Sequence, residues 1–153
     1  MEIFAPYLGS LLEYATYQNV RSETLTKALI NPDLDTADPN EMVDASEYLA
    51  VFNQVVEATD SEYCGLNFGC YLNLGALGLV LEISLNTSSI EQGVLILQNF
   101  LDKKFPLVSA KIVEDSQQFI LELDSPIEDV KLKKHLLDMV VSIIYRELKL
   151  MLN

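Results

Sequence analysis

Apolar residues recur at helical spacing through the first part of the chain. Leucines and an alanine repeat every three to four positions between Tyr7 and Asn19, which predicts an amphipathic helix. A second, short helix is expected to begin at Ser22 and to end before Pro32. The acidic run 33–43 contains Pro39 and little periodicity, so it is predicted to be an exposed connection.

Two further helices are predicted in the middle of the chain. Asp44 and Glu47 stand at the spacing of a capping box, and the apolar residues after them share one helical face. A short helix is expected over residues 62–72, where Gly65 and Gly69 lie four positions apart. These glycines favour close packing against a neighbouring element over a functional role.

The pattern then changes to one typical of strands. Residues 79–85 are short and densely apolar, which indicates a mostly buried strand. Ser89 is the expected N-cap of a helix that runs to about Asp102. The segments 107–113 and 118–123 are predicted to pair as an antiparallel hairpin.

A long helix is predicted at the end of the chain. Ser125 is the expected N-cap, with Pro126 at the first helical position, and the helix would run to about Leu152. Beyond His135 it is apolar on most of its circumference and must be buried on several sides. Its first half is expected to be the central pillar of the core. Its last two turns fit either the core or a contact between two copies of the chain, through Ile144, Leu148 and Met151.

These elements predict one α+β domain covering residues 1–153. Its N-terminal helices would pack on a small, mainly antiparallel sheet, with a crossover helix and a long C-terminal helix. Ten Lys and Arg residues against 23 Asp and Glu residues give a net charge of −13, which repels phosphate backbones. Direct nucleic-acid binding is not expected. Neither a secretory signal nor a membrane span is recognisable, so the cytoplasm is the expected location.

Residues suited to catalysis are scarce. His135 is the only histidine, and the lysines around it favour a position at the surface or at its boundary. Cys64 and Cys70 are expected to be buried thiols, because their spacing fits neither a metal site nor a disulfide framework. We therefore expect no enzyme activity, no bound metal and no cofactor.

A ligand-binding role depends on the predicted strand and on aromatic residues near it. Glu82 lies inside the apolar strand, where an unpaired inward-facing carboxylate is costly. It either faces solvent or contacts a ligand. The residues expected to surround a small molecule between the sheet and the helices are Tyr48, Phe52, Glu82, Ser84, Asn86 and Phe100.

Several short motifs resemble a known family. They are Tyr48-Leu49, Ala58-Thr59-Asp60, Gly65-Leu66, Gly69, Leu77-Gly78-Leu79, Ser84 and Ser89-Ile90-Glu91-Gln92-Gly93-Val94. Over roughly residues 8–150 the chain resembles the N-terminal effector-binding domain of AraC-type transcription regulators, in the arabinose-binding-domain-like subgroup. Leu81 stands where the family strand often has glycine, and Gly93 where the next helix often has alanine. Neither departure disturbs the expected fold.

The resemblance implies a domain that senses an unknown small-molecule effector, dimerises, or does both. Members usually continue into a helix-turn-helix domain, whereas this sequence ends at Asn153. A fragment of a longer regulator is favoured over a free-standing relative, and DNA would be contacted only through the absent domain. The alternative is a stand-alone interaction or dimerisation module without a small-molecule ligand.

Overall fold

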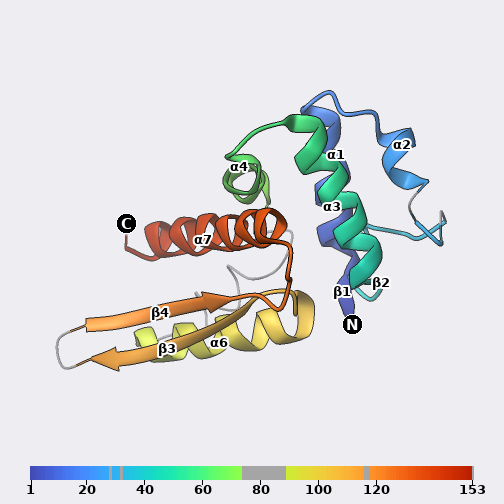
Figure 1. Cartoon of the computed structure of the whole chain (residues 1–153). Coiled ribbons are helices and arrows are strands. Elements are labelled where there is room, and N and C mark those ends of the chain that lie inside the picture. The colour runs from blue at the N-terminus through green and yellow to red at the C-terminus, as the bar shows by residue number, and fades with distance from the viewer. Residues whose placement is uncertain (28, 32, 74–88, 116–117, 153) are drawn as a thin grey trace.

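The computed structural model describes residues 1–27, 29–31, 33–73, 89–115 and 118–152. Helices dominate this part of the chain, accompanied by two small antiparallel sheets (Figure 1). This confirms the predicted α+β class. The elements, in chain order, are β1 (Glu2–Phe4), α1 (Ala5–Tyr17), α2 (Ser22–Thr26), β2 (Met42–Asp44), α3 (Ala45–Thr59), α4 (Cys64–Tyr71), α6 (Ile90–Lys104), β3 (Ser109–Asp115), β4 (Gln118–Asp124) and α7 (Val130–Leu152).

The first sheet was not predicted from the sequence. β1 pairs with β2 so that Ile3 lies opposite Val43, at the end of the segment expected to be an exposed connection. Three-residue strands are too short to show a period, and this pair joins segments some forty positions apart. The second sheet is the predicted hairpin, in which β3 and β4 pair with Ile112 opposite Leu121. The predicted strand 79–85 lies outside the described residues.

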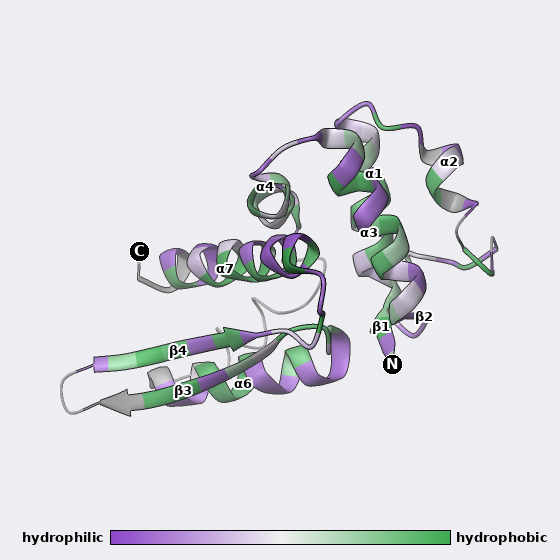
Figure 2. Ribbon diagram, viewed as in Figure 1, coloured by the Kyte–Doolittle hydropathy of each residue, from purple (hydrophilic) through white to green (hydrophobic). Residues whose placement is uncertain are grey.

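An aromatic cluster joins α1, α3 and α6 in the core. The Tyr7 ring lies 4.9 Å from the Phe105 ring, and the Tyr48 ring lies 5.4 Å from the same Phe105 ring. All three side chains are almost completely buried. Figure 2 shows apolar and polar residues alternating around these helices, the pattern expected of amphipathic helices packed on a shared core.

Helices α4 and α7 approach each other closely at the two glycines. A Cβ atom on Gly65 would lie 2.0 Å from the carbonyl oxygen of His135, and one on Gly69 would lie 2.5 Å from that of Met139. The expected backbone packing is therefore confirmed. Ser142 Oγ also donates a hydrogen bond of 3.1 Å to the Leu66 carbonyl oxygen. Figure 1 shows α4 lying across α7.

The environment of His135 differs from the prediction. Only 2% of its surface is exposed, and its Nδ1 atom accepts a hydrogen bond of 3.3 Å from the Gly65 backbone N–H. Burial lowers the pKa of His135, and the neighbouring Lys134 lowers it further, while Asp138 opposes the shift. Cys70 also differs from the prediction, because it is exposed and was expected to be buried.

The long C-terminal helix begins later than predicted. α7 starts at Val130, and Asp129 Oδ1 accepts the Leu132 backbone N–H at 2.8 Å. Ser125 Oγ instead accepts the N–H of Ile127, at 3.4 Å, in a local turn. Ile127 packs partly buried against the core, and Asp129 caps the helix in place of Ser125. The buried residues of the first half of α7 confirm its role as a pillar: Leu132, Leu136, Met139 and Val140.

Candidate functional site

The aromatic residues predicted to contact a ligand lie within the core. Tyr48 and Phe52 are fully buried on α3, and their rings stack at 6.0 Å. Phe100 is 6% exposed on α6, and its ring lies 6.3 Å from that of Tyr7. The structure thus brings the three residues into one cluster through Tyr7 and Phe105. The other predicted ligand residues lie outside the described part of the chain: Glu82, Ser84 and Asn86.

The space beside this cluster is very small. A cavity between α1, α6 and α7 leaves only about 10 Å³ for the centre of a water molecule. A cavity needs roughly 10–15 Å³ by this measure to hold one water, so an effector does not fit here as the helices stand. Its lining residues are Tyr7, Leu97, Phe100, Leu101, Phe105, Met139, Val140 and Ile143.

Two buried polar atoms accept or donate no hydrogen bond within the described structure: Tyr48 Oη and Glu147 Oε1. Burial raises the pKa of both groups, with Tyr7 adding to the shift of Tyr48 and Arg146 opposing that of Glu147. Arg146 is directed elsewhere, because its Nη1 donates at 2.8 Å to the Gly69 carbonyl oxygen. Buried groups without partners destabilise a fold, so both positions are informative targets for substitution.

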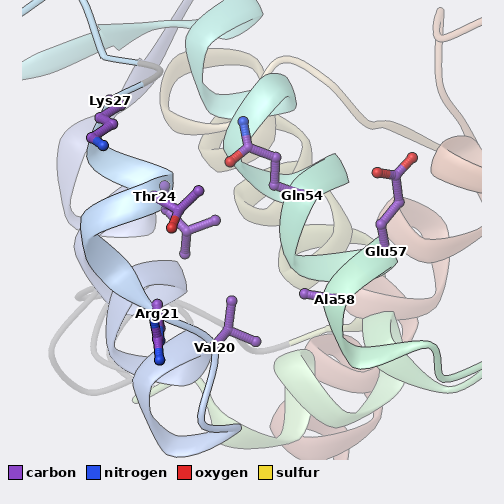
Figure 3. Close-up of a pocket in the computed structure, with 8 residues that line it drawn as sticks. Val20, Arg21, Thr24, Lys27, Gln54, Glu57 and Ala58 are labelled. Atoms are coloured by element: carbon purple, nitrogen blue, oxygen red, sulfur yellow. The ribbon is translucent and has the colours of Figure 1, made fainter.

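A much larger space lies on the surface between α2 and α3, and we call it the α2–α3 groove (Figure 3). Its volume is about 780 Å³, within the range of roughly 300–1,000 Å³ found for small-molecule sites. Size therefore favours the groove over the internal cavity. Its lining residues are Val20, Arg21, Thr24, Leu25, Lys27, Gln54, Glu57 and Ala58.

Local contacts hold the two walls of the groove in place. After α1 the chain turns at Asn19, whose φ is 61°, and the Val20 N–H bonds the Ala15 carbonyl oxygen at 2.8 Å. Leu25, only 2% exposed, anchors α2 in the core. Beyond α2, the Ile30 N–H donates to the Glu47 carboxylate at the start of α3. The chain is thus attached before, within and after α2.

The side chains of the groove combine charge, hydrogen-bonding groups and apolar surface. Figure 3 shows Arg21 and Lys27 towards the two ends of α2, and Gln54 leaning from α3 towards α2. Glu57 is held along α3 by a hydrogen bond of 3.2 Å from Asn53 Nδ2. Sequence reasoning missed these residues, because each is an ordinary surface type and no local motif joins α2 to α3.

The arrangement is suited to binding. Within the described residues, no cluster of three or more histidine, cysteine, aspartate or glutamate side chains could hold a metal ion. None of the groove residues is a histidine or a cysteine, the side chains most often used as base or nucleophile near neutral pH. The groove could instead hold a molecule of metabolite size by contact, hydrogen bonding and charge.

The outer face of α7 is the second surface of interest. Val141, Tyr145 and Leu148 are 47%, 65% and 48% exposed, and their spacing of four and three positions puts them on one helical face. Of the residues predicted for dimerisation, Leu148 belongs to this face and Ile144 is half-buried beside it. The Met151 side chain lies outside the described part.

Comparison with known proteins agrees with the resemblance seen in the sequence. Among the described residues, no helix has both the length and the hydropathy needed to cross a membrane.

A search of curated proteins finds no match. The family described as the N-terminal arabinose-binding domain of the AraC transcription regulator matches residues 21–152, which include all of the groove except Val20. The chain therefore belongs to the family of N-terminal arabinose-binding domains of AraC transcription regulators.

Proposed function

We propose that this chain senses a small-molecule effector for an AraC-type regulator, and that the effector binds in the α2–α3 groove. Family membership supports a ligand-sensing regulatory role. The volume of the groove, about 780 Å³, is the observation that supports this location, because the internal cavity has room for no more than one water.

The position of the groove suits a sensor. An effector that contacts both walls binds best when α2 and α3 are correctly spaced, so it shifts the population towards that arrangement. α3 in turn packs against α4 and α7. A change in α3 thus has a contiguous route to the C-terminal helix, from which we propose that it reaches a separate helix-turn-helix domain.

Thermal-shift screening with a groove-filling variant tests this proposal. L-arabinose, amino acids, other sugars and small organic acids form the screen. A ligand at 100 times its Kd adds about 2.7 kcal/mol of stability, which corresponds to roughly 5–10 °C in Tm for a chain of this size. The Ala58→Trp substitution fills the groove and should abolish the shift. Ala50→Trp is the control, because Ala50 is also exposed on α3 but does not line the groove.

Two results would contradict the proposal. If a compound raises the Tm of the folded Ala58→Trp variant as much as that of the wild type, it binds elsewhere, and the groove is excluded as its site. A complete screen without any shift in the wild-type protein removes the support for effector sensing by this chain.

A second candidate function is dimerisation, and the exposed apolar face of α7 favours it. We propose that a second copy of the chain covers Val141, Tyr145 and Leu148. Light scattering should detect a concentration-dependent dimer that Leu148→Glu dissociates. Val130→Glu is the matched control, since Val130 is 81% exposed at the start of the same helix. A wild-type monomer at the highest concentration contradicts this candidate.

A further inference from the structure

We infer that the α2–α3 groove selects an organic anion with an apolar part, whose acidic group is bound by Arg21 and Lys27. This inference rests on the proposed function, because it names the class of effector for the same groove. Three observations support it: the placement of the two cations, the nature of the remaining lining, and the position of the one acidic lining residue.

The two cations of the groove are available to a ligand. The other lysines of the hairpin and of early α7 mostly have carboxylate partners, as in the pairs Lys111–Glu122 and Lys133–Asp124. Within the described part of the chain, neither Arg21 nor Lys27 forms an ion pair. Basic residues number only ten against 23 acidic ones, so two of them at one groove make a local exception to the acidic surface.

Their spacing allows both to reach one ligand. Arg21 is the N-cap of α2 and Lys27 its C-cap, so they lie six positions apart. At 1.5 Å per residue this corresponds to about 9 Å along the helix axis. Long, flexible side chains at this separation can converge on one carboxylate, or can bind the two ends of a small diacid.

The rest of the lining favours a molecule that is more than a simple ion. Val20 and Ala58 supply apolar surface, while Thr24 and Gln54 supply groups that donate and accept hydrogen bonds. Such a mixture, with a few polar groups among apolar ones, is typical of sites that bind organic molecules. An inorganic anion would leave the apolar surface without a partner.

Acidic residues far from the groove have little effect on its preference for anions. Glu57 is the one acidic lining residue, so the groove side chains sum to one net positive charge. In Figure 3 its carboxylate points away from α2. The Debye length is about 8 Å at physiological ionic strength, so the distant carboxylates that make up most of the charge of −13 are screened.

Four probes test the inference directly. Benzoate, benzamide and benzylamine share one ring and differ in charge, and inorganic phosphate supplies charge without an apolar part. Each is titrated into the ¹⁵N-labelled chain while the amide resonances are followed by NMR. Benzoate should shift amides of residues 20–27 and 54–58, and should bind about five-fold or more tightly than benzamide and benzylamine, as one solvent-exposed ion contact allows. Phosphate should bind more weakly than benzoate.

Charge-removing variants identify the residues responsible. Arg21→Gln and Lys27→Gln should each weaken benzoate binding several-fold, and Glu57→Gln should strengthen it. Lys103→Gln removes the same charge from an exposed position on α6 and should have no effect. Because the contacts are exposed, raising the salt concentration should weaken benzoate binding and leave benzamide binding unchanged.

Several results would overturn the anion class. They are equal binding of the three ring compounds, binding of phosphate as tight as that of benzoate, no shift at the groove amides, or an equal effect of Lys103→Gln. These results would not by themselves contradict the proposed function, which is tested by a different experiment. If the thermal-shift screen finds a compound that Ala58→Trp blocks, the groove is the effector site even when benzoate does not bind.

Discussion

The contact between α4 and α7 makes Gly65→Ala a severe substitution. The new Cβ would lie 2.0 Å from the His135 carbonyl oxygen, whereas ordinary contact begins near 3.4 Å, so the helices must separate by 3.4 − 2.0 = 1.4 Å. The hydrogen bond from Gly65 N–H to His135 Nδ1, now 3.3 Å, would then break. The bond from Ser142 Oγ to the Leu66 carbonyl oxygen, now 3.1 Å, would break as well.

The expected loss follows from these two bonds. Each buried hydrogen bond that is broken without replacement costs about 1–3 kcal/mol, and alanine returns at most about 1 kcal/mol through its higher helix propensity. We therefore expect the free energy of unfolding to fall by about 1–5 kcal/mol. Urea denaturation followed by circular dichroism measures this change.

Gly9→Ala is the control for this substitution. The three atoms nearest to a Cβ on Gly9 all belong to Thr36, the closest at 3.0 Å, so a displacement of 3.4 − 3.0 = 0.4 Å removes this overlap. Its free energy of unfolding should stay within about 1 kcal/mol of the wild type. If Gly65→Ala is no less stable than Gly9→Ala, the glycines are not needed for the α4–α7 contact.

Three other substitutions test buried polar groups. Burial holds the pKa of His135 below its ordinary 6.5, so the folded state binds fewer protons than the unfolded state, and stability should fall as the pH drops below about 6.5. His135→Gln should reduce this dependence of stability on pH, measured by urea titrations at several pH values. An equal pH dependence in the variant and the wild type would refute the argument. Glu147→Leu removes a buried carboxyl oxygen without a partner and should raise Tm, so a fall in Tm argues for an essential polar contact. Tyr48→Phe removes the unpartnered hydroxyl and should keep or slightly raise stability, whereas a loss above about 1 kcal/mol in urea would show that the hydroxyl is bonded.

The helix starts signalled at Asp44 and Ser89 were predicted correctly, unlike the one signalled at Ser125. Asp44 Oδ1 accepts the Ser46 N–H at 2.8 Å, and Ser89 Oγ accepts the Gln92 N–H at 3.3 Å, so both helices begin where the sequence indicates. The second half of the predicted capping box at Asp44 does not form. Glu47 bonds the Ile30 N–H instead, because a tertiary contact across 17 positions competes with the local one.

Features that depend on distant partners were missed. Lys131 and Lys134 beside His135 suggested a surface position, yet both lysines are exposed while His135 lies on the helical face that meets α4. The partner of that face, Gly65, is 70 positions away. The pair of glycines four apart predicted close packing but did not identify its partner. The spacing of four and three positions that joins His135, Met139 and Ser142 could have identified the matching face of the last helix.

The location of the proposed binding site was harder to predict than the core, for a physical reason. Burial follows largely from residue type, and Tyr48, Phe52 and Phe100, which were predicted to contact a ligand, lie in a densely packed interior. A groove depends on the distance between two helices. Here the turn at Asn19 and the buried side chain of Leu25 fix the position of α2. Neither residue is marked by its type as part of a binding site. A search for unusual residues therefore finds the core of this domain, whereas the groove becomes visible only when α2 and α3 are placed side by side.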